Sequence, residues 1–201
     1  MNIPALAERN RERVLEAAVE VFAERGFYGS QVPQIATRAG VGVGTIYRNF
    51  ADKLALVNAA YARSKTAFMG ALLEDFPFGA PPREQFGVFW RRMVAFAIAE
   101  PHAIGFLELH HHAPYLSDEN RALELRALAP VAAFVAAASE AGVLRDAPVE
   151  LLIAITWGAF VGLVKATRMG HLTLDERVVR QAEACCWNAL RRTTPTPEED
   201  L

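Results

Sequence analysis

The chain has 201 residues, a mass of 22.1 kDa and a composition that is 52% hydrophobic and 22% charged. This apolar content is enough for a folded core and excludes a disordered or fibrous protein, while the length allows one or two domains. Two cysteines exclude a disulfide scaffold and a cysteine-rich zinc site, and they fit a reducing compartment.

The formal net charge of −2 hides an uneven distribution of charge along the chain. Residues 1–65 carry nine Lys/Arg against six Asp/Glu, whereas residues 66–201 carry twelve against seventeen. A basic N-terminal third is typical of a segment that faces a polyanion, although an asymmetry of this size can also arise by chance.

Helical periodicity begins in the first thirty residues. One apolar stripe predicts an amphipathic helix that ends at Gly26, and its members are Val14, Leu15, Ala18, Val21 and Phe22. Ser30 is expected to cap a second, short helix that runs to Ala39 and stops at Gly40. A third helix should hold residues 45–48.

The remaining helices follow in the same way. Asp52 should cap a fourth helix that extends as far as Phe76, and the Pro/Gly cluster at 77–82 predicts a loop. Five further helices are expected: one ending before Pro101, then 101–113, 118–141 with a kink or break at Pro130, 148–169 and 175–192. No stretch alternates with period two, so the predicted fold is all-α with about nine helices.

Two short helices joined by a glycine-containing turn, after a longer supporting helix, predict a helix-turn-helix. In this motif the first helix crosses the DNA backbone and the second lies in the major groove. Because many helical hairpins share the pattern, periodicity alone leaves an ordinary hairpin open.

A specific set of residues lies in this part of the chain: Gly26-Phe27, Ser30-Gln31-Val32, Ile35-Ala36, Ala39-Gly40-Val41, Gly44-Thr45-Ile46-Tyr47, Phe50, Lys53 and Leu56. Residues 10–60, which contain them, closely resemble the DNA-binding domain of the TetR (tetracycline repressor) family. The resemblance implies a DNA-binding domain over 1–55 and a helical effector-binding and dimerisation domain over 56–192. The polar tail 193–201 is expected to be disordered.

The resemblance also implies which residues touch DNA. Thr45 and Tyr47 correspond to contact positions, with the tyrosine hydroxyl on a phosphate, and Lys53 is expected to meet another phosphate. Val43, Gly44, Thr45 and Arg48 would read bases. Together with phosphate contacts near the second helix, the expected set is Ser30, Gln31, Val43, Gly44, Thr45, Tyr47, Arg48, Asn49 and Lys53.

Two positions depart from the family's pattern, and three N-terminal arginines allow two interpretations. Gly42 stands where the family more often has Ser or Thr, so one cap or phosphate contact is expected to be missing. Asn49 replaces a common His but keeps the ability to form hydrogen bonds. The N-terminal residues Arg9, Arg11 and Arg13 could form a basic arm near the minor groove or remain solvated helix charges.

An effector pocket is expected among the later helices, because aromatic and apolar residues with a few polar groups are typical of small-molecule sites. The candidate residues are Phe89, Trp90, Met93, His102, Phe106, His110, Trp157 and Phe160. His102, Phe106 and His110 are spaced four apart and should share a helix face. The alternative for every aromatic residue in this set is ordinary core packing.

The last two predicted helices are candidates for a dimer interface. Residues 151–164 are apolar on nearly all sides, so another surface must cover them, either within the chain or from a second copy. The family resemblance implies a four-helix bundle formed by two subunits. The candidate residues are Leu151, Ile155, Gly158, Gly162, Val178, Ala182 and Cys186.

The sequence gives little support for a metal site, a cofactor site or a catalytic site. His110, His111 and His112 point about 100° apart on a helix and cannot all bind one ion, so no metal site is expected. No phosphate-binding glycine loop, HExxH motif or nucleophile elbow is present, so we expect neither a cofactor nor an enzyme. The apolar stretch 151–164 is shorter than a membrane span and the N-terminus is charged, which predicts a cytoplasmic protein.

The sequence therefore predicts a DNA-binding transcriptional regulator. We expect a homodimeric repressor that a small, largely apolar effector releases from a palindromic double-stranded operator. One alternative is a helical small-molecule-binding protein or enzyme that carries a TetR-like N-terminus. Another is a dimer that regulates through a protein partner and has no pocket.

Overall fold

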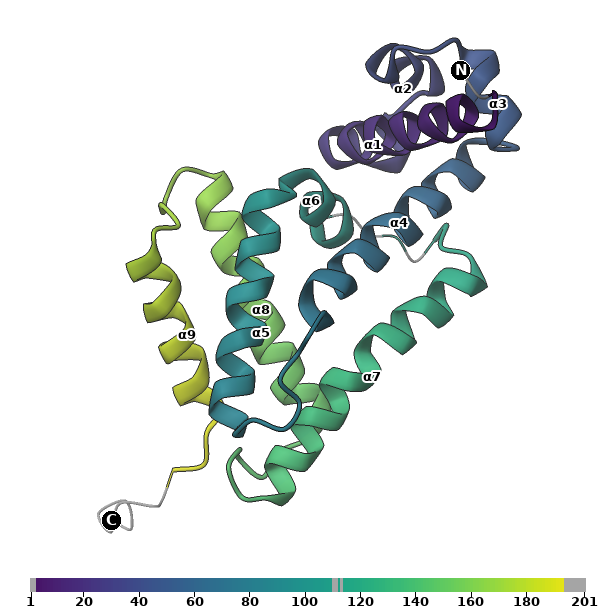
Figure 1. The fold of residues 1–201 in the computed structure, drawn as a ribbon. Helices are drawn as coiled ribbons and strands as arrows, with labels where there is room; N and C mark the ends of the chain where they lie inside the picture. Colours follow the sequence, from purple (N-terminus) through teal and green to yellow (C-terminus); the bar gives the residue numbers. More distant parts are fainter. Residues whose placement is uncertain (1–2, 110–111, 113, 194–201) are drawn as a thin grey trace. The chain divides into compact units, whose positions relative to one another are not determined.

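The computed structural model describes residues 3–109, 112 and 114–193, and Figure 1 shows their helical arrangement. Over this part of the chain the predicted all-α class and the number of helices are confirmed. The helices are α1 (Ile3–Gly29), α2 (Val32–Ala39), α3 (Val43–Asn49), α4 (Lys53–Leu73), α5 (Pro82–Ala99), α6 (Pro101–Leu109), α7 (Asp118–Glu140), α8 (Val149–Arg168) and α9 (Glu176–Leu190).

The chain divides into two compact units. The first unit comprises Met1–Ala71 and Phe96–Leu125, and the second comprises Leu72–Ala95 and Arg126–Leu201. The first unit therefore joins α1–α4 to α6 and the start of α7, and the second joins most of α5 to the rest of α7, α8 and α9.

The first unit is built on α1. Its predicted apolar stripe is buried throughout, and α2, α3 and α6 all pack on this helix. Phe22 of α1 stacks on Phe106 of α6 with ring centroids 5.7 Å apart. Gly26 interrupts the helical path with φ 67°, a left-handed conformation that costs glycine little, so the last residues before α2 take a new direction.

Most predicted helix boundaries hold. Gly40 ends α2 in the left-handed conformation, and Asp52 begins α4 by accepting a hydrogen bond from the Ala55 N–H at 2.7 Å. Asp175 accepts the Val178 N–H at 2.8 Å in the same way and caps α9.

Ser30 does not cap α2, which corrects the sequence prediction. Gln31 occupies the N-cap position, and its N–H donates to Gln34 Oε1 at 3.0 Å. The Ser30 hydroxyl instead lies within 2.5 Å of the Gly26 carbonyl oxygen and 3.3 Å of the Val21 carbonyl oxygen. The break at Gly26 brings the C-terminal end of α1 within reach of this hydroxyl, which donates to its carbonyl oxygens instead of to the start of α2.

Three other helices differ from their predicted extents. The fourth helix ends at Leu73 rather than Phe76, and α6 ends at Leu109, beyond which residues 110, 111 and 113 lie outside the described residues. The seventh continues through Pro130 as one helix. The predicted tail falls outside the described residues from 194 onward.

A buried carboxylate on α9 is paired with two arginines of α5 in the second unit. Glu183 is buried, and Oε1 accepts a hydrogen bond from the Arg83 guanidinium at 2.7 Å, while Arg91 lies 3.6 Å from Oε2. Arg83 also lies over the Trp187 ring at 5.3 Å. These contacts fix one face of α9 against α5, because a buried charge is stable only when it is paired.

Gly87 makes room for this carboxylate. A Cβ atom at this position would lie 2.9 Å from Glu183 Oε1 and 3.0 Å from the Arg91 guanidinium. A Cβ at Gly70 of α4, in contrast, would meet nothing within 4 Å.

We predict that Gly87→Ala lowers the free energy of unfolding by about 1 kcal/mol, because displacing the paired carboxylate outweighs the gain in helix propensity. The control Gly70→Ala should raise it by about 0.5–1 kcal/mol, since only the propensity changes. Urea denaturation followed by circular dichroism measures both. Equal stabilisation by the two substitutions would show that Gly87 is not needed for the ion pair.

Candidate nucleic-acid interface

The helix-turn-helix has its own apolar core. Ile35 and Ala36 of α2, Ile46 of α3 and Phe50 after it are all buried, as their spacing predicts. Gly40 allows the sharp turn between the two helices, and the Arg13 guanidinium of α1 lies against it, 2.7 Å from where a Cβ would be. The turn and both helices are therefore fixed on α1.

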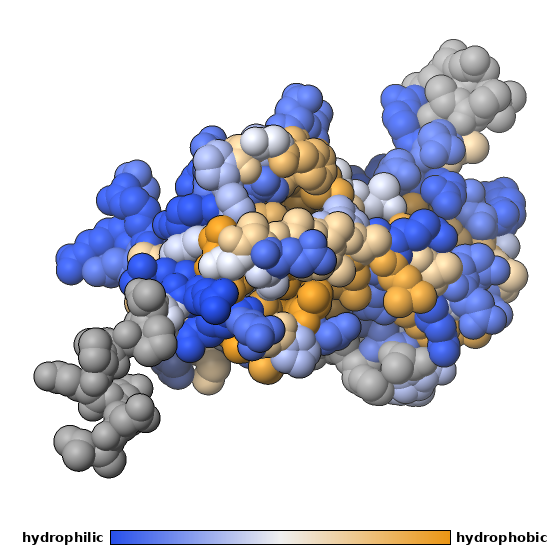
Figure 2. Space-filling view, turned by 90° about the horizontal axis from the view of Figure 1, so that it is seen from below, coloured by the Kyte–Doolittle hydropathy of each residue, from blue (hydrophilic) through white to orange (hydrophobic). Residues whose placement is uncertain are grey.

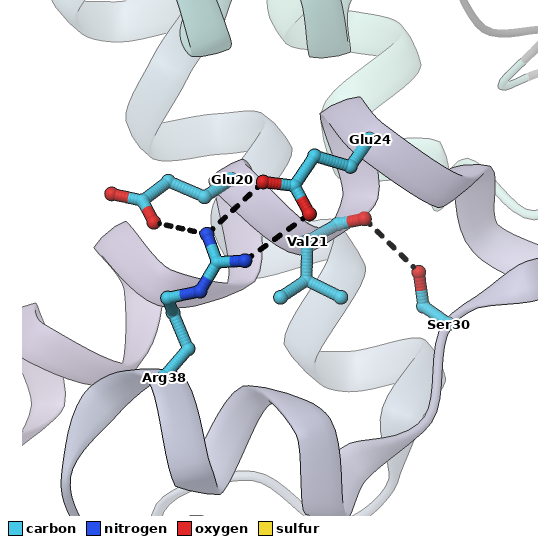
Figure 3. Close-up of polar contacts among 5 residues, drawn as sticks. All are labelled: Glu20, Val21, Glu24, Ser30 and Arg38. Atoms are coloured by element: carbon cyan, nitrogen blue, oxygen red, sulfur yellow. Dashed lines mark hydrogen bonds and ion pairs between the residues drawn. The ribbon is translucent and has the colours of Figure 1, made fainter.

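Arg38 attaches α2 to α1 by charge as well (Figure 3). Its guanidinium donates to Glu20 Oε2 at 2.7 Å and to both carboxylate oxygens of Glu24 at 3.1 and 3.2 Å. The hydrogen bonds from Arg38 lower the pKa of Glu24, and they raise the pKa of the guanidinium. The two-pronged contact restrains the angle between α1 and α2, because a planar guanidinium fits a carboxylate in one orientation.

The outer side of α3 presents polar groups to solvent. Gly44, Tyr47, Arg48 and Asn49 are exposed, with Tyr47 52% exposed despite its aromatic ring. A Cβ at Gly44 would meet nothing within 4 Å, so the backbone here is open to close approach. Exposed side chains on the second helix of this motif are in the position from which such proteins read the major groove.

Thr45 organises two of these side chains. Arg48 Nη2 donates to Thr45 Oγ1 at 2.9 Å, and Asn49 Nδ2 donates to the Thr45 carbonyl oxygen at 2.8 Å. Thr45 is half-buried, as is Val43 at the start of the helix. Asn49 is thus tied to its own helix, whereas Arg48 keeps further donors for an acceptor outside the chain.

At the start of α2, Ser30 and Gln31, which are both predicted to contact a phosphate, differ in their exposure to solvent. Ser30 is buried and its hydroxyl points inward to the end of α1, so this side chain is not presented to solvent and its phosphate contact stays a prediction. Gln31 is exposed beside it. The reason is local, since the helix break at Gly26 makes an inward hydroxyl more favourable than an outward one.

Lys53 begins α4 and reaches across to the same segment. Its ammonium donates to the Ser30 carbonyl oxygen at 2.6 Å and lies 4.4 Å from the centre of the Phe27 ring. Partial burial lowers the pKa of this lysine. An ammonium has three donors, so Lys53 can keep this bond and still donate to another acceptor.

The arginines of the predicted basic arm are partly engaged with the motif. Arg11 lies 5.6 Å from the Phe50 ring, and Arg13 lies against Gly40. Arg9 is exposed. Arg11 and Arg13 therefore lie against the helix-turn-helix from α1, while Arg9 and Arg13 are both exposed to solvent.

Within the first unit, an aromatic cluster lies behind this surface. Phe27 stacks on Tyr115 at 4.5 Å, and the hydroxyl of Tyr115 lies 2.8 Å from His112 Nδ1. On α4, Asn58 donates to the Tyr115 carbonyl oxygen at 2.9 Å and accepts from the Ser117 N–H at 2.7 Å. The segment after α6 is thereby joined to both α1 and α4.

The predicted effector residues fall into different surroundings. Trp90, Met93 and Phe160 are fully buried in the second unit, where Phe89 and Trp157 are half-buried. In the first unit Phe106 is buried against α1, whereas His102, four residues earlier, is exposed. Packing of α1 covers the side of α6 that holds Phe106 and leaves the first turn open. His110 lies outside the described residues.

The predicted dimer residues are also divided. On α8, Leu151, Ile155, Gly158 and Gly162 are exposed, and on α9 Val178 and Ala182 are half-buried. Cys186 is buried within the chain, and burial raises the pKa of its thiol; its place in a dimer interface stays a prediction. Cys185, one position earlier, is exposed instead because neighbouring helical side chains point about 100° apart.

Two polar residues on α4 were not identified from the sequence. Ser64 and Lys65 are both buried in the first unit. A helical wheel would have shown Lys65 four residues after Tyr61 and three before Phe68, as a charge within an apolar stripe. Among the described residues, no group of three or more His, Cys, Asp or Glu side chains is placed to hold a metal ion.

These features define a helix-turn-helix DNA-binding protein with a separate helical domain. The family model of bacterial regulatory proteins of the TetR family matches residues 14–60, and that of the tetracycline repressor-like C-terminal domain matches residues 61–192. The chain belongs to the TetR family and is a DNA-binding transcriptional regulator.

Individual relatives are similar over different lengths. The fatty acid metabolism regulator protein of Bacillus subtilis is 37% identical over 73 residues, which cover 36% of this chain and 38% of that protein. A helix-turn-helix transcriptional regulator of Haemophilus influenzae is 22% identical over 90% of this chain and 95% of its own length. A TetR-family regulator of Marinobacter aquaeolei shares the fold with a TM-score of 0.85, at 22% identity, over 95% of this chain and all of that one.

We predict that Arg38→Met lowers stability at pH 7 and that the deficit shrinks in acid. The pKa of Glu24 is lowered in the folded chain, so its contribution is present above the ordinary value of 4.5 and is lost as the pH falls through the lowered value. Urea denaturation of both proteins at pH 7 and pH 3.5 measures this. Arg145→Met, at an exposed position, is the control. A deficit that is the same at both pH values would exclude the ion pair as its cause.

Proposed function

We propose that this regulator is a homodimeric repressor that binds a palindromic operator and leaves it when a small, largely apolar effector binds. The observation that carries the proposal is the exposed side of α3, where Tyr47 and Arg48 project from a helix that is otherwise fixed on α1. A rigid support with an exposed reading helix is the arrangement that major-groove recognition requires.

The proposed DNA contacts are of two kinds: contacts to phosphates, which position the protein, and contacts to bases, which recognise the sequence. Tyr47, Gln31 and Lys53 would bind phosphates, which fix orientation without reading sequence. Arg48 would reach a guanine edge, and the half-buried Val43 and Thr45 would offer methyl groups to a thymine. Gly44 leaves space for the backbone to approach the duplex. Asn49 stays in this set through its exposed position on α3.

The second copy would bind at the outer face of α8. Its exposed residues are apolar or very small and follow helical spacing: Leu151, Ala154, Ile155, Gly158, Ala159 and Gly162. Only 17% of the apolar window of this helix is buried within the chain. Figure 2 shows apolar surface that lies open between hydrophilic side chains on the face seen from below. Glycines four residues apart allow two helices to approach closely.

By length and composition alone, α7 and α8 could each cross a membrane. Membership in a family of DNA-binding regulators supports a different explanation for α8, in which a second subunit covers its apolar face. The two subunits would place their α3 helices one DNA turn apart, about 34–36 Å, or a multiple of it.

The effector would act by favouring a conformation in which the two reading helices are wrongly spaced. Moving an equilibrium from 1:99 to 99:1 requires about 5.5 kcal/mol of differential binding. The buried aromatic residues of α5 and α8, Trp90 and Phe160, are candidates for its contacts in the second unit. Sequencing of DNA selected from a random pool by the purified protein tests the whole proposal, since a palindrome reports both recognition and two-fold symmetry.

We predict that Arg48→Ala weakens binding to the selected operator by about 1–3 kcal/mol and relaxes the preference at one base pair of each half-site. Lys53→Met should weaken binding to all sequences and reduce the salt slope by about one per site. Fluorescence anisotropy over a series of salt concentrations measures both, with Arg145→Met as the control. Unchanged affinity and slope in both variants would contradict this mode of binding.

We predict that Gly158→Leu and Gly162→Leu each convert the dimer to a monomer without unfolding it. Within the chain a Cβ at either position meets nothing within 4 Å, so a larger side chain can clash only with another molecule. Light scattering after size exclusion measures the mass, and operator affinity should fall with dimerisation. Gly70→Leu, at an equally open glycine, should remain dimeric. Dimers in all three variants would place the interface elsewhere.

A further inference from the structure

Carboxylates recur every four residues along α1. The residues that share this spacing are Glu12, Glu16, Glu20 and Glu24. A spacing of four places them along one slowly winding line on the helix surface. Arg38 of α2 pairs with Glu20 and Glu24. The two carboxylates nearer the start of α1 are bound by a residue of α4.

Arg63 of α4 bridges these two carboxylates. Its Nε atom donates to Glu12 Oε2 at 2.9 Å, and its Nη2 atom donates to Glu16 Oε1 at 3.1 Å. The donors of a guanidinium lie in one plane and point in fixed directions. An arginine that reaches two successive carboxylates therefore restrains both the distance between α4 and α1 and the position of α4 along α1.

Glu12 also connects this bridge to the end of the reading helix α3. Its Oε1 atom lies 3.7 Å from the Arg11 guanidinium, and Arg11 lies 5.6 Å from the centre of the Phe50 ring. Phe50 directly follows α3 and is buried in the core of the helix-turn-helix. A continuous series of contacts thus leads from Arg63 of α4 through α1 to the end of α3.

A second polar contact of α4 with the DNA-binding motif lies at its first residue. Lys53 donates to the Ser30 carbonyl oxygen and lies over the Phe27 ring. Along a helix, the distance from residue 53 to residue 63 is about 15 Å. Two contacts separated by this distance define the direction of α4, whereas one contact would allow the helix to pivot. The direction of α4 in turn determines where the ammonium of Lys53 lies relative to α3.

We propose that Arg63 is a positioning residue for DNA binding, which holds α4 at the angle that presents Lys53 to a phosphate. Arg63 acts through Glu12 and Glu16 and does not itself touch DNA. This inference rests on the proposed phosphate contact of Lys53. Exposed ion pairs contribute little to stability, so the effect of the bridge is expected in DNA binding rather than in the free energy of unfolding.

The first test is Arg63→Met, which keeps an unbranched side chain and removes both hydrogen bonds. It should weaken binding to the selected operator about three- to tenfold and reduce the salt slope by about one per site, because Lys53 loses its phosphate contact. Combining Arg63→Met with Lys53→Met should reduce the slope no further than Lys53→Met does alone. Fluorescence anisotropy over a series of salt concentrations measures all three proteins. An additive reduction of the slope would overturn the proposal.

A second variant separates positioning from charge. Glu12→Gln combined with Glu16→Gln removes two negative charges from the DNA-binding unit, so electrostatic attraction alone predicts tighter binding to DNA. Loss of the bridge predicts the opposite, a weakening of about threefold or more. The matched control is Glu8→Gln, at an exposed position one turn earlier on α1, which should bind at least as tightly as the unaltered protein. Equal or tighter binding by the double glutamine variant would overturn the proposal.

Melting temperatures of the same samples distinguish positioning from a purely structural role. Because exposed ion pairs stabilise a protein little, neither Arg63→Met nor the double glutamine variant should melt more than about 5 °C below the unaltered protein. A larger fall in both would overturn the proposal, since weak binding would then follow from a damaged fold. An unchanged salt slope in Lys53→Met rejects the proposed phosphate contact itself. A reduced slope in Lys53→Met, with unchanged binding by the other two variants, rejects this inference alone.

Discussion

Burial of the apolar stripe of α1 is the constraint on which the DNA-binding surface depends. The helix-turn-helix is too short to form a sufficient core by itself, so α2 and α3 pack on α1, whose other contacts include Phe106 of α6. Arg38 then fixes the motif by ion pairs, and the Arg13 guanidinium lies against Gly40 at the turn. Because α1 is shared, any shift of α6 relative to α1 within this unit must be accommodated by the support of the reading helix.

Several buried or half-buried charged groups find their partners within the same chain. The buried Glu183 is held by Arg83 and Arg91, and the half-buried Lys53 donates to a backbone carbonyl. The apolar face of α8, in contrast, is exposed to solvent and is not covered by any other part of the chain that the structure describes. Such an exposed apolar face makes physical sense in a protein that binds another molecule.

Corrections to the sequence analysis arose where a side chain had more than one possible partner. Ser30 is a good N-cap residue by type, but the broken end of α1 offers it carbonyl acceptors closer by. His102 and Phe106 have helical spacing, yet only the second is covered by α1. Cys185 and Cys186 are identical in type, and only the contact between α8 and α9 decides which one is buried.

The sequence by itself determined the helices, most of their caps, the helix-turn-helix and the family, because these depend on local periodicity and on residue types at fixed spacing. Tertiary structure alone decided that Lys53 reaches Ser30, that Glu183 lies close against Gly87, and that the Ser64 hydroxyl is buried without a hydrogen-bond partner. Such facts depend on groups far apart in the chain. Local pattern carries no information on whether a buried charge will find its counter-charge, since that depends on which helices pack together.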